Sequence, residues 1–600
     1  MVDVAGRAAE ALEFDPVALR ERYRAERDRR LRGDGNDQYR DPAGTLARYL
    51  DDPYADPGFN RPPLTDQVDV LVIGGGFGGL LAAARLREAG IEGIRVLEKA
   101  ADFGGTWYWN RYPGAACDIE SYIYLPLLEE TGYLPTEKYA RGEEILGYAR
   151  RIAAHFDLYR NACFQTEATE LRWDDAAGHW VVSTSRGDRI RARFVITAGG
   201  PLHRPKLPGI DGIETFRGHS FHTSRWDYGY TGSAADGLPG LAGKRVGIIG
   251  TGATAVQCVP HLGASAERLF VFQRTPSSID VRGNRPTDPD WSSTLRPGWQ
   301  QHRMDNFNAL VSGRPVDEDL VNDGWTDILH NLGVMRARAG RSGDAGAAEL
   351  VQLADFQKME QIRARVDAVV RDPATAEALK PYYNQFCKRP CFHDSYLDTF
   401  NLPSVQLVDT LGQGVERIVE RGVVVAGEVY PVDCLIYATG FEIGTDLSHQ
   451  AGFDVYGRDG RSLRDKWRDG PMTFHGFSSH GFPNYFVVSI TQSGQTPNFV
   501  HMLAEQAKHL AYILTECAAR GANTVEATEA AESAWTDSIV ELAELRRPFL
   551  EECTPGYYNN EGQLSRQAAR SGSYGKGPIA FARVLEQWRA DGSLAGLTLD

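Results

Sequence analysis

The sequence predicts an α/β fold with two Rossmann-like dinucleotide-binding domains, an inserted helical subdomain and an N-terminal extension. A buried strand, a glycine turn and an apolar helix follow one another at 68–90, and the same order recurs from residue 245. Between residues 285 and 385 the strand pattern gives way to a polar, helical one. A chain of 600 residues exceeds the roughly 250–300 residues at which one hydrophobic core stops growing, so we expect two or three packed units.

The first glycine turn carries the fingerprint G-x-G-x-x-G at Gly74, Gly76 and Gly79, between a buried strand and a helix. The first glycine permits the tight turn, the second lets the backbone approach a pyrophosphate, and the third lets helix and strand pack closely. Glu98 follows the next strand, where a carboxylate can accept hydrogen bonds from a ribose diol. The sequence therefore predicts a dinucleotide site at this turn.

The second glycine turn reads G-x-G-x-x-A, with Gly250 and Gly252 as its two glycines. Where the first unit has its carboxylate, this unit has Arg274 and Thr275. A carboxylate would repel the 2′-phosphate of NADPH, whereas a guanidinium and a hydroxyl can bind it. We therefore expect NADPH rather than NADH here; a surface arginine without a ligand is the alternative for Arg274.

Two dinucleotide sites with different charge preferences indicate electron transfer from a pyridine nucleotide to a bound flavin, so we expect NADPH and FAD as cofactors. The cysteines are Cys117, Cys163, Cys258, Cys387, Cys391, Cys434, Cys517 and Cys553. They form no C-x-x-C pair, so we expect reduced, mostly structural thiols and no metal site, including at Cys387 and Cys391. Without a redox dithiol or a haem motif, oxygen is the remaining electron acceptor.

These patterns divide the chain into consecutive segments. We predict an N-terminal extension with a charged helix at 16–32 (1–65), the first part of the FAD-binding domain (66–205), the first part of the NADPH-binding domain (206–284), a helical insertion (285–385), the second part of the NADPH-binding domain (386–435), and the second part of the FAD-binding domain with the C-terminal region (436–600).

Charge and hydropathy exclude several classes of partner. The net charge of −15 is spread along the chain without a basic tract, so nothing supports a nucleic-acid partner and we expect none. No stretch approaches the ~18 consecutive apolar residues of a membrane span, and residues 1–31 are charged without the apolar centre of a signal peptide. We therefore expect a cytoplasmic protein without membrane contact, as a monomer or homodimer.

Two segments carry a family resemblance. Residues 104–118 read GGTWYWNRYPGAACD, and residues 216–227 match F-x-G-x-x-x-H-x-x-x-W-[PD] at Phe216, Gly218, His222, Trp226 and Asp227. Both closely resemble the type I Baeyer–Villiger monooxygenases, and the resemblance extends over about 66–560. The N-terminal extension and CTPGYYNN at 553–560 are most similar to the cyclopentadecanone monooxygenase branch.

The resemblance implies a role for each site residue. It implies that Arg389 is the active-site arginine and that Asp118 is the carboxylate that holds it. It also implies that Gly105, Thr106, Trp107 and Asp118 belong to the FAD site, with Tyr108 and Trp109 as further aromatic surface beside the flavin. Lys388 would join Arg274 and Thr275 on the NADPH phosphate, and His222 and Trp226 would couple domain movement to turnover. One departure is Ala116, where some relatives have arginine.

Each of these roles has a structural alternative. Asp118 and Arg389 could form an ion pair that only joins two domains, His222 could be a buried structural histidine, and the three aromatic residues at 107–109 could be core.

The activity implied by the resemblance is the use of NADPH and O2 to form a C4a-peroxyflavin that converts a ketone into an ester or lactone. A large cyclic or polycyclic ketone is expected from the branch resemblance, with residues 491–494 among the pocket lining. The alternatives are an N- or S-hydroxylating flavin monooxygenase, which needs no strong cation beside the reacting carbonyl, and a non-catalytic nucleotide sensor.

Overall fold

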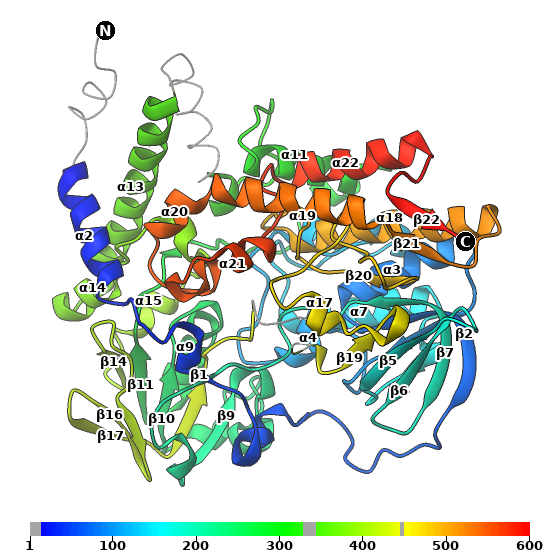
Figure 1. Ribbon diagram of the computed structural model, residues 1–600. Helices are drawn as coiled ribbons and strands as arrows, with labels where there is room; N and C mark the ends of the chain where they lie inside the picture. The colour runs from blue at the N-terminus through cyan, green and yellow to red at the C-terminus, as the bar shows by residue number, and fades with distance from the viewer. Residues whose placement is uncertain (1–13, 328–343, 444–448, 450) are drawn as a thin grey trace.

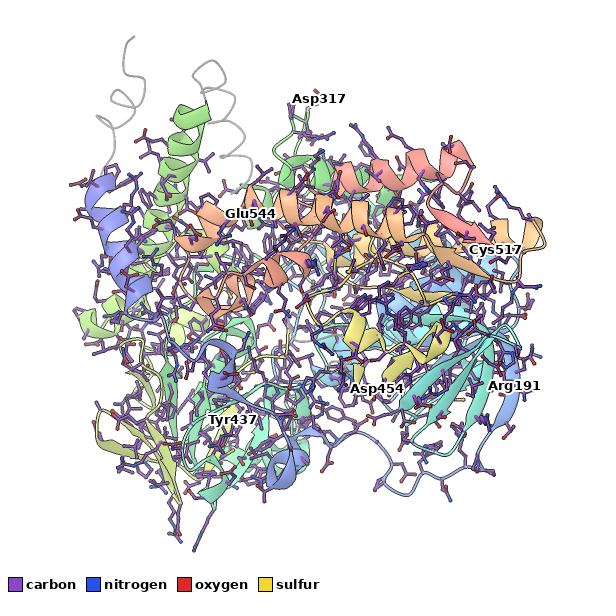
Figure 2. The ribbon with its side chains drawn as sticks, in the orientation of Figure 1. Arg191, Asp317, Tyr437, Asp454, Cys517 and Glu544 are labelled. Carbon is purple, nitrogen blue, oxygen red and sulfur yellow. A yellow bond between two sulfur atoms is a disulfide. The ribbon has the colours of Figure 1, made fainter. Side chains whose placement is uncertain are left out.

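The structure is a computed structural model that describes residues 14–327, 344–443, 449 and 451–600 (Figure 1). Residues 1–13 of the predicted extension, 328–343 of the predicted insertion, and 444–448 and 450 of the predicted FAD-binding part lie outside the described residues. The chain folds into two α/β domains, each built around its own sheet, with long helices packed along one side (Figure 1). Tyr437 and Asp454, labelled in Figure 2, lie one on each sheet.

The first sheet has eight strands in the order β19-β5-β6-β7-β2-β3-β4, with β20 pairing β7. Its strands are β2 (Thr65–Ile73), β3 (Ile94–Leu97), β4 (Ala162–Cys163), β5 (Ala168–Asp174), β6 (His179–Thr184), β7 (Arg189–Thr197), β19 (Asp454–Tyr456) and β20 (Tyr485–Val487). β2 runs parallel to β3 and β7, and its residues 70–73 are all buried, as a strand covered on both faces requires. Helices α3 (Phe77–Glu88), α7 (Gly142–His155) and α18 (Phe499–Ala519) cover one face.

The second sheet has five parallel strands in the order β14-β11-β10-β18-β9. Its strands are β9 (His219–His222), β10 (Arg245–Ile249), β11 (Arg268–Gln273), β14 (Val405–Asp409) and β18 (Cys434–Tyr437). Alternate residues of β11 face opposite sides: Leu269 and Val271 pack with α9 (Ala253–Ser265), whereas Phe270 and Phe272 pack toward a small antiparallel sheet. That sheet contains β15 (Arg417–Val419), β16 (Gly422–Val425) and β17 (Glu428–Pro431). Both predicted dinucleotide-binding units are therefore present.

The described residues between 285 and 385 contain helices and no strand, in agreement with the predicted loss of strand signals. These helices are α10 (Pro289–Ser293), α11 (Trp299–Val311), α13 (Asp344–Val369) and α14 (Pro373–Leu379). The C-terminal part adds α19 (Glu529–Glu544), α20 (Arg547–Glu551), α21 (Arg566–Arg570) and α22 (Pro578–Asp591). Figure 1 shows α11, α19 and α22 along the same side of the molecule as α18.

Several short helices and strand pairs lie between these elements. They are α4 (Thr106–Trp109), α5 (Ser121–Tyr124), α6 (Leu128–Thr131), α8 (Tyr228–Thr231), α15 (Tyr396–Thr399) and α17 (Leu463–Lys466), and the strand pairs β12 (Ile279–Asp280) with β13 (Cys391–Phe392) and β21 (Val525–Ala527) with β22 (Leu597–Leu599). Among the described residues, no helix has the length and apolarity needed to span a bilayer.

The N-terminal extension lies along the second domain. Its first helix, α2 (Pro16–Asp28), packs beside α13, where the rings of Tyr23 and Phe356 meet edge to face with centroids 5.0 Å apart (Figure 1). The helix ends at Asp28 rather than at the predicted residue 32, because the chain turns and the amide of Arg30 donates to the carbonyl of Arg27. Farther on, β1 (Tyr39–Arg40) pairs antiparallel with β8 (Leu207–Pro208).

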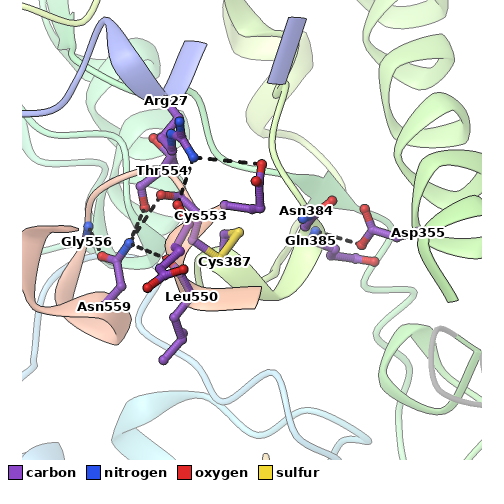
Figure 3. Close-up of a disulfide and its surroundings, with 12 residues drawn as sticks. Arg27, Asp355, Asn384, Gln385, Cys387, Leu550, Cys553, Thr554, Gly556 and Asn559 are labelled. Carbon is purple, nitrogen blue, oxygen red and sulfur yellow. Dashed lines mark hydrogen bonds and ion pairs between the residues drawn. A yellow bond between two sulfur atoms is a disulfide. The ribbon is translucent and has the colours of Figure 1, made fainter. Parts of the chain in front are cut away.

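The expectation of reduced thiols is wrong for two of the cysteines. Cys387 and Cys553 form a disulfide, with Cα atoms 5.0 Å apart and a sequence separation of 166 residues (Figure 3). The spacing criterion recognises only pairs that are close in sequence, whereas this pair is created by the fold. The other six cysteines are buried thiols, as expected. The disulfide joins the segment that carries Arg389 to the C-terminal segment 553–562.

Candidate active site

A connected cavity of about 2560 Å³ lies between the two domains. Its lining includes both glycine turns, the predicted arginine Arg389 and residues of the C-terminal segment 553–562. The parallel strands place the turns there, because the loops after β2 and β10 both leave the carboxyl ends of their sheets, where α/β proteins bind ligands.

The first glycine turn is fixed by close backbone contacts. Gly74 has φ +113°, and a Cβ added to it would lie 2.4 Å from the carbonyl oxygen of Ala198. A Cβ on Gly79 would lie 1.9 Å from the Gly74 oxygen, so glycine is required where α3 meets β2. Gly105, at φ +53°, packs so closely that its Cβ would lie 2.5 Å from the Cα of Gly76. This contact brings Thr106 and α4 beside the turn.

Glu98 braces the same turn. Its Oε2 accepts a hydrogen bond from the Gly75 amide at 2.5 Å, and its Oε1 accepts one from the Ala100 amide at 2.7 Å. Burial raises the pKa of this carboxyl, and the two amides oppose that rise. Because each carboxylate oxygen has a further lone pair, Glu98 can still accept from a ribose hydroxyl in the cavity that it lines. The bracing role was not predicted from the sequence.

The second glycine turn repeats the geometry with one informative difference. Gly250 has φ +111°, and its Cβ would lie 2.5 Å from the carbonyl oxygen of Ala438. A Cβ on Gly252 would meet no atom within 4 Å. Packing within the described chain therefore does not require glycine at 252, whereas the close approach of a dinucleotide phosphate does. This turn thus fits an NADPH pyrophosphate.

Beyond this turn, three predicted phosphate ligands converge on the cavity. Arg274, Thr275 and Lys388 all line it. Among the described residues, the buried Thr275 hydroxyl has no hydrogen-bond partner, and Lys388 Nζ makes no hydrogen bond or ion pair. Burial, and then the charge of Arg274, lower the pKa of Lys388 to about 8. A site with unsatisfied donors and excess positive charge fits a phosphate group.

The predicted pair Asp118 and Arg389 is in contact across the domains. Arg389 donates from Nη1 to Oδ2 at 2.7 Å and from Nη2 to Oδ1 at 2.6 Å, which makes the pair bidentate. Burial acts to lower the pKa of Arg389, but the carboxylate of Asp118 more than offsets it, and that pKa lies well above its usual value. The Asp118 side chain is 4% exposed and that of Arg389 is 37% exposed. A permanent cation therefore faces the cavity, held in a fixed orientation.

The aromatic residues of α4 differ in what they face. Trp107 and Trp109 line the cavity, and the Trp107 indole donates to the Tyr124 hydroxyl at 3.0 Å. Tyr108 does not line the cavity, because its ring is buried and its hydroxyl donates to Asp52 of the N-terminal extension at 2.8 Å. The prediction that Tyr108 lies beside the flavin is therefore wrong, and the core alternative holds for this residue.

His222 lies near the link between the domains, whereas Trp226 packs in the core of the second domain. Both are fully buried, and His222 stacks edge to face on Phe441 with ring centroids 5.7 Å apart. Burial, and then the charge of Arg225, lower the pKa of His222 to about 3, so the ring is neutral. The chain crosses between the sheets at Phe441, which makes an isolated β-bridge with Pro205. This position suits the coupling role, which stays a prediction, and makes acid–base chemistry at neutral pH unfavourable.

The predicted pocket lining at 491–494 is half right. Thr491 and Gly494 line the cavity, whereas Gln492 and Ser493 are fully buried. Gln492 holds neighbouring loops together, since its amide donates to the carbonyls of Pro471 and Arg570. Sequence reasoning missed other residues that line the cavity: Gln38, Tyr39, Lys206, Tyr557 and Glu561. No local motif marks them, because the fold brings four of them to the cavity from the two ends of the chain and Lys206 from the segment just before β8.

Comparison with known proteins identifies the family. A family model described as pyridine nucleotide-disulphide oxidoreductase matches residues 71–309. Neopentalenolactone D synthase of Streptomyces avermitilis is 54% identical over 590 residues, which cover 98% of this chain and 99% of that protein. A Baeyer–Villiger monooxygenase of Streptomyces coelicolor is 51% identical over 590 residues, or 97% of each chain. The chain belongs to the Baeyer–Villiger monooxygenases.

Solved structures support the assignment of this chain to the Baeyer–Villiger monooxygenases. The polycyclic ketone monooxygenase from the thermophilic fungus Thermothelomyces thermophila superimposes with a TM-score of 0.90 at 40% identity, covering 97% of this chain and 99% of that one. A complex of OTEMO with FAD and NADP superimposes with a TM-score of 0.73 at 27% identity, covering 90% and 100%. The predicted family, fold class and pair of cofactors are thus confirmed.

Proposed function

We propose that this monooxygenase uses NADPH and O2 to convert a polycyclic or large cyclic ketone into a lactone or ester. The observation that carries the proposal is the bidentate pair of Arg389 and Asp118, which faces a cavity shared with both glycine turns. In the balanced reaction, one oxygen atom enters the bond between the carbonyl carbon and its neighbour, and the other leaves as water, with NADPH and a proton supplying the reducing equivalents.

In this proposal FAD occupies the turn at Gly74, Gly76 and Gly79, and NADPH occupies the turn at Gly250 and Gly252. Glu98 accepts from the FAD ribose, while Gly105, Thr106, Trp107 and Asp118 border the flavin end of that site. When bound, reduced FAD supplies the electrons that activate O2. Gly76 and Gly252 both line the cavity, and the lack of a side chain lets each backbone approach a pyrophosphate.

Arg389 has the properties that the carbonyl chemistry requires. Negative charge develops on the former carbonyl oxygen when the carbon is attacked, and a pre-oriented guanidinium stabilises that charge without reorganisation. Asp118 fixes the guanidinium plane through two hydrogen bonds. Because the pKa of Arg389 lies well above its usual value, the residue remains a cation throughout and does not lose its proton to the reacting groups.

The residues around Arg389 favour a substrate with several rings. Tyr557 and Phe386 line the cavity. Trp325 lies beside Asp118, because the Trp325 indole donates to the backbone carbonyl of Asp118 at 3.0 Å. Flat aromatic surfaces bind fused rings through apolar contact. The names of the relatives support the same class, since one is a polycyclic ketone monooxygenase and another makes neopentalenolactone D. We further propose a cytoplasmic location and a monomer or homodimer without a nucleic-acid partner.

The proposal is tested by measuring NADPH consumption and identifying the products by mass spectrometry. The purified protein should be yellow and should add one oxygen to polycyclic ketones as a lactone, at the expense of NADPH and O2. If ketones gave only hydrogen peroxide while amines or sulfides were oxygenated, the enzyme would be a hydroxylating monooxygenase instead. A colourless protein that binds nucleotides without turnover would indicate a sensor.

Replacing Arg274 by alanine should raise the KM for NADPH by about 10- to 100-fold, the effect of losing a charge-assisted hydrogen bond. The KM for NADH should change less than about twofold, because NADH has no 2′-phosphate. Steady-state kinetics with both nucleotides measure the split. Arg268→Ala is the matched control, since Arg268 begins β11, the strand that Arg274 directly follows, but donates to Pro403 and Gln406 instead. Equal losses with both nucleotides would show that Arg274 is only structural.

The KM for NADPH should rise as the pH increases through about 8. Lys388 has a pKa lowered to about 8, so it is charged below that pH and loses its proton above it. Arg274 and Arg30 favour the loss, and Glu561 and Cys391 oppose it. We expect the KM to increase up to about tenfold between pH 7 and 9.5, the value of roughly one phosphate contact. The KM for NADH should stay flat, and Lys388→Met should remove the pH dependence; a persistent slope in that variant would exclude Lys388.

A further inference from the structure

Part of the N-terminal extension reaches the predicted phosphate site. The guanidinium of Arg274 donates from Nη1 to the side-chain oxygen of Gln38. The backbone carbonyl of Arg274 accepts from Nε of Arg30, whose side chain is 6% exposed. Gln38 is itself fixed in position. Its side-chain amide nitrogen donates to the Gly35 carbonyl at 2.5 Å, and its backbone carbonyl accepts from the Gly209 amide at 2.8 Å. The extension therefore fixes Arg274 at both its backbone and its side chain.

The other end of the chain closes the same site. Glu561 is 4% exposed, and its Oε1 accepts from the Tyr39 hydroxyl at 3.0 Å. Its Oε2 lies 3.5 Å from Nη2 of Arg274 and has no hydrogen-bond partner in the described part of the chain. Asn36 also donates to the side-chain oxygen of Asn560 at 2.6 Å. The two ends of the chain thus hold each other beside Arg274.

The charges at this site match a phosphate ester. Arg274 lies 3.5 Å and Lys206 lies 4.0 Å from the Glu561 carboxylate. Lys388 is close enough that the charges of Arg274 and Glu561 both act on its pKa, the first lowering it and the second raising it. Three cations and one carboxylate leave an excess of two positive charges, which a 2′-phosphate dianion would neutralise. The Thr275 hydroxyl and Glu561 Oε2, neither of which has a hydrogen-bond partner among the described residues, belong to residues that line the same cavity. The first can donate to phosphate, and the second can accept from a nucleotide hydroxyl or amino group.

We propose that residues 36–39 of the N-terminal extension form part of the NADPH site, with Gln38 as a positioning residue for the 2′-phosphate. Gln38 holds the guanidinium of Arg274 toward the cavity. The remaining N–H groups of Arg274 can then bind the phosphate without the entropy cost of ordering the side chain first. Tyr39 acts in the same way on Glu561. The inference rests on the proposed use of NADPH, and it assigns to the extension a function in discriminating NADPH from NADH.

The test measures binding rather than turnover. The FAD-loaded protein is titrated calorimetrically with adenosine 2′,5′-bisphosphate and with adenosine 5′-monophosphate, which differ only in the 2′-phosphate. The wild type should prefer the bisphosphate by roughly tenfold or more. Gln38→Ala should reduce this preference about three- to tenfold, less than the loss of a charge-assisted hydrogen bond to the phosphate itself, because Gln38 acts on the phosphate only through Arg274. Gln38→Met, which keeps the side-chain length without the amide oxygen, should do the same and serves if the alanine variant folds poorly.

Two further variants separate positioning from general damage. Arg40→Ala is the matched control. Arg40 is the next charged residue of the extension after Gln38, but it pairs with Glu214 instead of Arg274, so its loss should leave the preference for the bisphosphate unchanged. Adding Gln38→Ala to Arg274→Ala should have no further effect if Gln38 acts through Arg274. A wild type without preference for the bisphosphate would overturn the NADPH assignment itself. A wild-type preference that survives both Gln38 substitutions would overturn the role of the extension alone.

Discussion

Replacing Arg389 by alanine should abolish lactone formation while NADPH continues to reduce the flavin. The expected loss is about 10³-fold or more, because removing even one donor from an anion-stabilising site costs about 10²–10³ in turnover, and Arg389 supplies a full charge. Flavin reduction should persist, since hydride transfer from NADPH creates no anionic oxygen for the guanidinium to stabilise. Stopped-flow absorbance of the flavin measures the first step, and product analysis measures the second.

The Arg389→Ala result needs a control for the charge left behind. Without its partner, Asp118 is an unpaired carboxylate at 4% exposure, which lowers the free energy of unfolding. Arg389→Lys keeps a cation but not the two-pronged geometry, so it should restore stability and little of the activity. Arg285→Ala removes an exposed arginine outside the cavity and should behave as the wild type. Full ketone oxidation by Arg389→Ala would refute the proposed role.

The features that the sequence predicted correctly are those whose cause is local. The turns at Gly74 and Gly250 were recognised because strand, turn and helix are adjacent in the chain, and the left-handed φ of both glycines bears out the reading. The Asp118–Arg389 pair joins distant segments, and only the family resemblance could indicate it. Its observed geometry, with two hydrogen bonds, agrees with that indication.

The features that were missed depend on contacts between distant segments. The disulfide joins Cys387 to Cys553, and neither cysteine has a neighbour in sequence that would indicate pairing. Gln38 and Glu561 reach Arg274 from opposite ends of the chain, and an isolated Gln or Glu has no motif of its own. Tyr108 was misplaced because three consecutive aromatic residues cannot all face one side of a helix, and its side chain points to the extension instead.

Replacing Asp118 should decide whether the pair with Arg389 is catalytic or only structural. Asp118→Asn keeps one acceptor but loses the charge and the fork geometry, so Arg389 should lose its fixed orientation. We expect lactone formation to fall about 10²- to 10³-fold, with NADPH consumption continuing and hydrogen peroxide released instead. Asp118→Ala should in addition lower the free energy of unfolding by about 1–2 kcal/mol, because Arg389 loses its partner but stays partly hydrated at 37% exposure.

The decisive quantity is the amount of lactone formed per NADPH consumed, because this ratio does not depend on the fraction of enzyme that is folded. A catalytic pair predicts that Asp118→Asn and Arg389→Ala both lower the ratio, even where their melting temperatures equal that of the wild type. A pair that only joins two domains predicts the opposite: melting temperatures fall, while every molecule that remains folded couples NADPH to lactone as before. The bidentate geometry toward a shared cavity favours the first outcome.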